Sequence, residues 1–214
     1  MRFQKPTFLT AVLGVLCLAI LLSLGFWQLD RREWKQEVMA TVQDQLETLA
    51  VPLPAKLSPD WEYRRVLVSG PVVPNSWFRF PGRSQDGKVG DLLMLLIKTE
   101  SGRYVLLEHS FVGFGEALPP LPAAVAKEGI LRLPTEPGLF TPDNNIAANQ
   151  WYTADPGAMA EAAKAGEGPV LSFYVVSKNW EPYLPNDHLQ YALTWFSFSV
   201  IFLIIFVLFH RRKG

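Results

Sequence analysis

The stretch that decides the fold is YALTWFSFSVIFLIIFVLF, residues 191–209, which is nineteen residues long and carries no formal charge. An α-helix rises about 1.5 Å per residue, so a helix of this length covers about the thickness of the hydrocarbon core of a bilayer. A basic cluster, HRRK at residues 210–213, follows directly. Such clusters are retained on the cytoplasmic side, so the sequence predicts a membrane-spanning helix with a cytoplasmic C-terminus.

A second apolar run, residues 7–27, is also long enough to span a membrane. A cleaved signal peptide is the alternative, since Ser23-Leu24-Gly25 resembles a cleavage site, but the run is longer than the usual core of about 7 to 15 residues. Two spans place both termini on the same side, which leaves the segment between them outside the cytoplasm. Because no transit peptide precedes the first span, we expect a two-pass protein of the bacterial inner membrane with a periplasmic domain.

Three regions follow from these spans. Residues 1–29 are predicted to form the N-terminal transmembrane helix with a short cytoplasmic start, residues 30–184 a single periplasmic domain, and residues 185–214 the C-terminal transmembrane helix with a basic tail. The chain has twenty basic and twenty acidic residues and no basic stripe, so nucleic acid is not an expected partner. Cys17 is the only cysteine and lies within the first span, which excludes an intrachain disulfide.

The periplasmic region alternates between patterns typical of strands and helices. An apolar stripe at residues 38–49 predicts a helix that ends at Pro52, and Asp155-Pro156 before an Ala-rich segment predicts a capped helix over 157–165. Segments 91–99 and 103–110 read as a hairpin. Together the pattern predicts an α+β domain with a mostly antiparallel sheet, whose strands are expected at 65–69, 77–80, 91–99, 103–110, 130–133, 150–153 and 170–177.

Catalytic motifs are absent from the sequence. We find no glycine-rich phosphate loop, no Gly-x-Ser-x-Gly elbow and no His-Glu-x-x-His pair. The only histidine expected in the periplasmic domain, outside the spans and their mouths, is His109. Strand alternation points its neighbours Glu108 and Ser110 to the opposite face, so we interpret His109 as structural and expect no enzyme.

Two motifs lie at the outer ends of the spans. LGFWQLDRREWK, residues 24–35, contains a Gly-x-Trp-Gln pattern, and DHLQYALTW, residues 187–195, is similar to an Asn-His-x-x-Tyr-Ala-x-x-Trp signature. In this pairing and order the chain resembles the surfeit locus protein one family, the Shy1-type assembly factors for cytochrome c oxidase. Asp187 replaces an asparagine, and His109-Ser110-Phe111 stands where the family commonly has Arg-Gly-Trp. Weaker matches lie between the motifs, at Tyr63, Arg65, Val66, Gly70, Pro81, Arg83, Gly90, Gly129, Arg132, residues 140–144 and Trp151.

The resemblance implies an accessory role in the biogenesis of a haem-copper oxidase. Members of the family are expected to help haem a reach oxidase subunit I, or to stabilise that subunit while the cofactor is inserted. By position, His188 is the implied axial ligand of the haem iron. Oxidase subunit I, haem a synthase and membrane lipid are the implied partners.

The residues themselves agree with this reading but do not require it. In a helix that starts near residue 186, a stripe on one side is formed by His188, Tyr191, Ala192 and Trp195. Gln28 is in a position to hydrogen bond across to the second helix, and Trp27 is a further candidate contact of the cofactor. Asp187 either favours a charged imidazole or accepts a hydrogen bond that orients the ring.

Three functions remain open at this point. Tyr and Trp are enriched at bilayer interfaces, so the stripe is also compatible with a plain membrane anchor. The chain is therefore a haem a-binding assembly factor, a protein scaffold that stabilises an oxidase intermediate without haem, or a membrane-anchored periplasmic enzyme.

Overall fold

The computed structural model describes residues 2–3, 6–182 and 184–212, and Lys213 of the predicted basic cluster lies outside this range. The chain divides into two compact units, a helical unit of residues 1–42 with 182–214 and a sheet unit of residues 43–181. The sequence placed the corresponding boundaries at 29/30 and 184/185. The first boundary differs because one helix, α1 (Phe8–Glu47), runs through it without a break.

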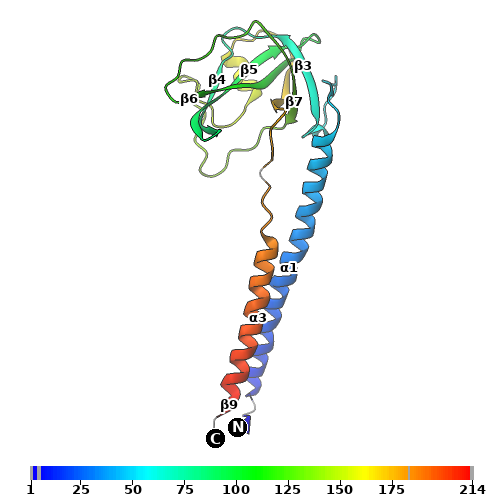
Figure 1. Cartoon of the computed structure of the whole chain (residues 1–214), viewed down its shortest axis with the longest axis vertical. Coiled ribbons are helices and arrows are strands. Elements are labelled where there is room, and N and C mark those ends of the chain that lie inside the picture. The colour runs from blue at the N-terminus through cyan, green and yellow to red at the C-terminus, as the bar shows by residue number, and fades with distance from the viewer. Residues whose placement is uncertain (1, 4–5, 183, 213–214) are drawn as a thin grey trace. The chain divides into compact units, whose positions relative to one another are not determined.

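The helical unit contains the two predicted spans. Both α1 and α3 (His188–His210) are long and apolar enough to cross a membrane, with mean hydropathy of 2.6 and 2.5 in their most apolar windows. The helix predicted from the stripe at residues 38–49 is the continuation of α1, because no Gly or Pro interrupts the chain between Gly25 and Pro52. The short strands β1 (Arg2–Phe3) and β9 (Arg211–Arg212) pair next to the N-terminal end of α1 and the C-terminal end of α3 (Figure 1).

Glycines let the two spans approach each other closely. A Cβ atom at Gly25 would lie 2.4 Å from the ring of Phe196, and one at Gly14 would lie 2.7 Å from the ring of Phe206. Phe196 also meets Phe26 edge-on, with ring centroids 5.4 Å apart. Small residues that admit a neighbouring side chain drive helix association in membranes, where lipid competes equally for apolar surface.

The sheet unit is the α+β domain that the sequence predicted. Its seven strands lie in the order β2-β3-β7-β8-β6-β5-β4, and all pairs are antiparallel except β2 with β3 and β6 with β8. The predicted hairpin is β5 with β6. The bounds are β2 (Val51–Pro52), β3 (Arg65–Pro71), β4 (Phe78–Gln85), β5 (Lys88–Lys98), β6 (Tyr104–Gly113), β7 (Ala124–Arg132) and β8 (Val170–Ser177), with a 3-10 turn at Pro59–Trp61.

Several features differ from the predicted elements. The strand predicted at 130–133 is only the end of β7, which begins at Ala124. The segment 150–153 is not a strand but makes only isolated bridges, from Gln150 to Arg79 and to Asn145. A second hairpin, β4 with β5, turns at Asp86-Gly87, where φ is +50° and +75°. Positive φ at both central residues is typical of the two-residue type I′ turn, for which Asp-Gly is a preferred pair.

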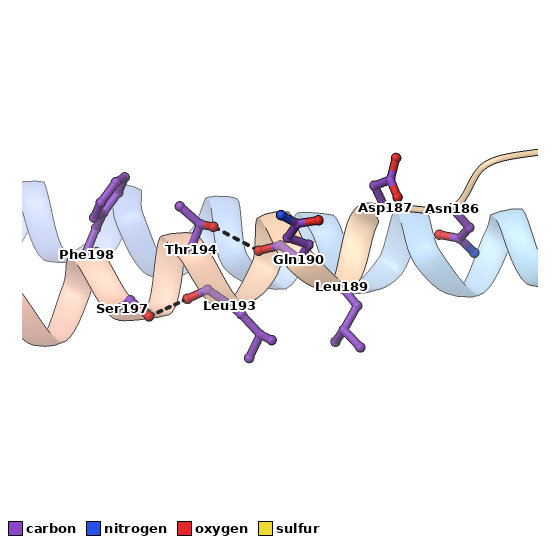
Figure 2. A pocket seen from close by; sticks show the side chains of 8 residues that line it. All are labelled: Asn186, Asp187, Leu189, Gln190, Leu193, Thr194, Ser197 and Phe198. Atoms are coloured by element: carbon purple, nitrogen blue, oxygen red, sulfur yellow. Dashed lines mark hydrogen bonds between the residues drawn. The ribbon is translucent and has the colours of Figure 1, made fainter.

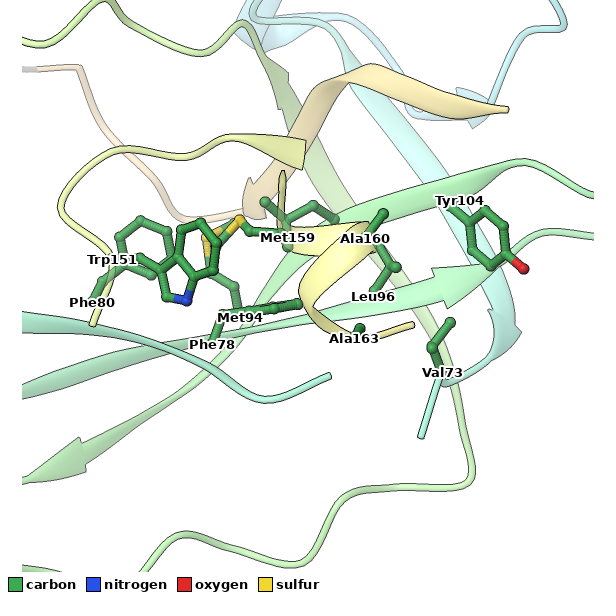
Figure 3. Packing of buried hydrophobic residues seen from close by; sticks show 11 residues of the cluster. Val73, Phe78, Phe80, Met94, Leu96, Tyr104, Trp151, Met159, Ala160 and Ala163 are labelled. Atoms are coloured by element: carbon green, nitrogen blue, oxygen red, sulfur yellow. The ribbon is translucent and has the colours of Figure 1, made fainter. Parts of the chain in front are cut away.

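Apolar side chains cover both faces of the sheet. On one face, α2 (Pro156–Ala162) brings Met159 and Ala160 against the sheet, and its predicted N-cap is confirmed because the Asp155 side chain accepts from the Ala158 amide. Trp151 is 1% exposed and packs edge-on against Phe78 in the same cluster (Figure 3). The opposite face carries a second cluster built on β3, β5, β6, β7 and β8.

Candidate functional site

A hydrogen bond between the two spans joins the two sequence motifs. His188, the first residue of α3, places Nδ1 at 2.8 Å from Oε1 of Gln28 on α1. A carboxamide oxygen only accepts, so Nδ1 is the donor, and in the neutral form of the imidazole Nε2 then keeps its lone pair. The predicted bond from Gln28 to the second helix is therefore confirmed, and it leaves His188 with a nitrogen able to bind a metal.

Contacts on either side of this bond fix the register of the helices. Nδ2 of Asn186 donates to the carbonyl oxygen of Arg32 at 3.4 Å, next to the histidine. On the other side, Ala192 is 1% exposed and Phe196 lies over Gly25. Ala192 is one turn beyond His188, and Gly25 is about one turn before Gln28. The close approach that Gly25 permits is thus what brings the amide and the imidazole within hydrogen-bonding distance.

The other residues predicted to contact the cofactor differ in their exposure. Tyr191 is 57% exposed and Trp27 is 52% exposed, while Trp195 is half-buried and meets Phe198 edge-on. The face of α3 with buried side chains includes Ala192 and Ser199, and Tyr191 lies outside it. As contacts of a cofactor, these aromatic residues remain predictions.

Asp187 does not orient the imidazole. It is exposed, forms the N-cap of α3 without a side-chain hydrogen bond, and lines a surface hollow of about 560 Å³ on α3 (Figure 2). In that hollow the hydroxyl of Thr194 donates to the carbonyl of Gln190, and both have exposed side chains. Gln28 is the acceptor that orients the His188 ring. The sequence had predicted only that Gln28 forms a hydrogen bond to the second helix.

The other two histidines are placed elsewhere. Nδ1 of His210 lies 2.8 Å from the carbonyl oxygen of Phe206, at the far end of α3. In the sheet unit, the ring centroids of His109 and Trp77 are 5.6 Å apart. Burial lowers the pKa of His109, and the charge of Lys127 lowers it further. Within the described ranges, no three His, Cys, Asp or Glu side chains are grouped to hold a metal ion. A single imidazole with an open nitrogen instead fits a metal that arrives within a macrocycle, because the macrocycle supplies the remaining ligands.

Comparison with known proteins places these two motifs in one family. A profile of the SURF1 family matches residues 15–200. The chain belongs to the SURF1 family. A SURF1-like protein of Rickettsia felis is 28% identical over 95% of this chain and 97% of the relative, and one of Monosiga brevicollis is 32% identical over 89% and 83%. The cytochrome oxidase assembly protein SHY1 of Saccharomyces cerevisiae is 28% identical over 69% of this chain and 40% of that protein.

The SURF1 match covers both sides of the bonded pair. Residues 15–200 include Gln28 on the first span and His188 on the second, together with the whole sheet unit. Membership was predicted from the motifs at these two positions, and it is confirmed. Nothing in the sequence indicated that Gln28 and His188 lie within hydrogen-bonding distance, because they are 160 residues apart in the chain.

Proposed function

We propose that this SURF1 family member is an assembly factor for a haem-copper (cytochrome c) oxidase, which binds haem a through His188 and aids its delivery to subunit I. Family membership and the name of the yeast relative support a role in oxidase assembly. The observation that carries the haem part is the 2.8 Å bond between Gln28 and His188, because it orients the ring and, in the neutral imidazole, directs the proton to Nδ1 so that Nε2 is open.

In this proposal haem a is cargo, and the protein binds it with one imidazole. His210 is 22 residues further along the same helix, which is about 33 Å at 1.5 Å per residue, and His109 lies in the other unit. A single ligand suits cargo that must be released again. The aromatic side chains of Trp27, Tyr191 and Trp195 are the candidate contacts for the ring and its substituents.

The proposal places the protein in the bacterial inner membrane with both termini in the cytoplasm and the sheet unit in the periplasm. Two spanning helices at the ends of the chain and Arg211-Arg212 beyond the second one support this arrangement. Subunit I is the recipient, haem a synthase is a candidate donor of the cargo, and membrane lipid surrounds the helices.

The test is expression of the full chain alongside the enzymes of haem a synthesis, followed by purification and pigment extraction. We expect a haem a spectrum in the wild type, its loss in His188→Ala, and its retention in the matched variant His109→Ala. A colourless wild type that still copurifies with subunit I contradicts haem binding and favours the scaffold function. A hydrolytic activity that His109→Ala abolishes favours the enzyme.

A further inference from the structure

The sheet unit contains a large cavity that the proposed function does not use. Beyond α2, the sheet face is left open over β4, β5, β6 and β8, and the hollow there measures about 1010 Å³. Its lining is polar and aromatic, in contrast to the apolar cluster under α2. The side chains that matter below are Arg83, Glu108, Phe111, Tyr152, Tyr174 and Trp180.

A β-bulge gives the cavity its mixed lining. Regular alternation would point Glu108 and Phe111 to opposite faces of β6. The pairing shifts, however, so that Leu93 is opposite Ser110 while Met94 is opposite Glu108. One extra residue on β6 therefore turns Glu108 and Phe111 into the same hollow.

Arg83 differs from the other arginines of the sheet unit. Among the described residues its guanidinium makes no hydrogen bond and no ion pair, and its charge acts through space on Glu108 and Tyr174. The other arginines are engaged with partners, namely Arg64 with the ring of Trp61, Arg65 with Glu128, Arg79 with Asp91, Arg103 with the carbonyls of residues 53–55, and Arg132 with Glu62.

Trp180, which lines the same cavity as Arg83, is held in place by other contacts. The guanidinium of Arg132 lies 4.2 Å from the centre of the Trp180 ring and 4.9 Å from that of Tyr63. Arg132 is itself fixed by Glu62, at 3.2 Å between Nε and Oε1. Because Trp180 is already ordered, a ligand that packs on it loses little side-chain entropy on binding.

Glu108 is an acidic side chain in the cavity, and its negative charge opposes the binding of an anion. Its carboxylate accepts a hydrogen bond from the Ser177 backbone amide, and Lys127 and Arg83 supply positive charge nearby. Burial nevertheless raises the pKa of Glu108, because the hollow hydrates its ionised form poorly. An ionised Glu108 repels a second anion, so removing its charge must strengthen the binding of an anion at Arg83.

We propose that this cavity binds an organic anion, a carboxylate or phosphate monoester attached to a planar ring. Arg83 pairs with the anionic group, and Phe111, Tyr152 and Trp180 contact the ring. An arginine without a protein partner is suited to such groups because its donors match two acceptor oxygens at once. The volume is at the upper end of small-molecule sites, which are about 300–1,000 Å³.

The test is titration calorimetry on the full chain in lipid nanodiscs, with empty nanodiscs as the blank. The probes are 2-naphthoate and 2-naphthyl phosphate, and uncharged 2-naphthamide is the control for the ring alone. We expect both anions to bind at least about tenfold more tightly than the amide, in line with a hydrogen bond to a charged group. Whichever anion binds more tightly identifies the source as an organic acid or a phosphate ester.

Two variants should change the affinity in opposite directions. Arg83→Gln should reduce the affinity for both anions to the affinity for the amide. Glu108→Gln should increase the affinity for both anions. Lys88→Gln, on the same hairpin but outside the cavity, should leave both unchanged. Equal affinity for anions and amide, no binding of any probe, or an unchanged affinity in Arg83→Gln would overturn the proposal. Because a misfolded variant cannot gain affinity, Glu108→Gln keeps the test independent of folding.

Discussion

Replacing Gln28 by leucine removes the one side-chain acceptor that the His188 ring has among the described residues. Leucine fills similar space on α1 but accepts no hydrogen bond, so Nδ1 loses its partner and the imidazole is free to adopt the other tautomer. Gln28→Glu is the matched variant, because its carboxylate still presents an acceptor oxygen at the same reach. The two substitutions therefore separate the acceptor from the volume of the side chain.

The expected size of the effect follows from one neutral bond at 2.8 Å between two membrane helices. Such bonds contribute about 0.6 kcal/mol on average, and up to about 1.7, in membrane proteins. The ratio of the two His188 tautomers should thus change by about threefold, and by no more than about twentyfold. Loss of an orienting partner of a metal-bound histidine typically costs about 10 to 100-fold in metal affinity, so haem retention should fall further than the tautomer ratio.

The tautomer is measurable without haem. Nitrogen chemical shifts of the full chain, labelled with 15N-histidine and reconstituted in lipid, distinguish a protonated Nδ1 from a protonated Nε2. His188→Ala assigns the signal among the three histidines by difference. The wild type and Gln28→Glu should show a protonated Nδ1, and Gln28→Leu a mixture; a wild type with its proton on Nε2 would refute the reasoning even if the protein bound haem.

Three further predictions concern packing and pH. Gly25→Leu should remove the protonated-Nδ1 signal of His188, because a side chain there collides with Phe196. Trp151→Ala should destabilise the sheet unit by about 3–5 kcal/mol in urea unfolding, as expected for a buried aromatic residue. The pKa of His109 is lowered, so the contribution of its neutral form to the free energy of unfolding is complete above about pH 6.5 and is lost as the pH falls through the lowered pKa. The free energy of unfolding of His109→Asn should therefore fall less steeply than that of the wild type as the pH is lowered.

Each of these has a control or a contrary outcome. Trp27→Leu, two residues from Gly25 but half exposed, should leave the His188 signal unchanged. An unfolding midpoint of Trp151→Ala equal to that of the wild type would mean that the ring is not part of the core. For the pH prediction, parallel stability curves for the wild type and His109→Asn between pH 5 and 8 would contradict a lowered pKa.

Local patterns were sufficient for most of the fold because they depend on near neighbours in the chain. Residues 170–177 were predicted as a strand and form β8, and Asp155 caps α2 as its sequence context indicates. The segment 150–153 was predicted as a strand on the same grounds and is not one, since pairing depends on a partner strand. The Asp86-Gly87 pair is a recognisable turn sequence, but the strand predicted at 77–80 ended before it, so the hairpin was not predicted.

The candidate site was predictable in its parts but not in its arrangement. His188 and Gln28 were both singled out because each lies at the outer end of an apolar span. Their mutual bond, and with it the choice of Gln28 over Asp187 as the acceptor, depends on the packing of Phe196 over Gly25. The cavity itself had no sequence signal, although Arg83 was among the weaker family matches, because its lining comes from six separate segments and from a bulge that breaks strand alternation.

The sequence by itself determined two spans, an α+β domain between them and the family, because hydrophobic length, strand alternation and short motifs are written in consecutive residues. Only the tertiary structure decided which nitrogen of His188 faces an acceptor, since that depends on an atom 160 residues away in the chain. It also decided that Arg83 makes no hydrogen bond or ion pair with the residues that the structure describes, while the other arginines of the sheet unit are engaged. Both are properties of pairs of groups, and a pair exists only once the chain has folded.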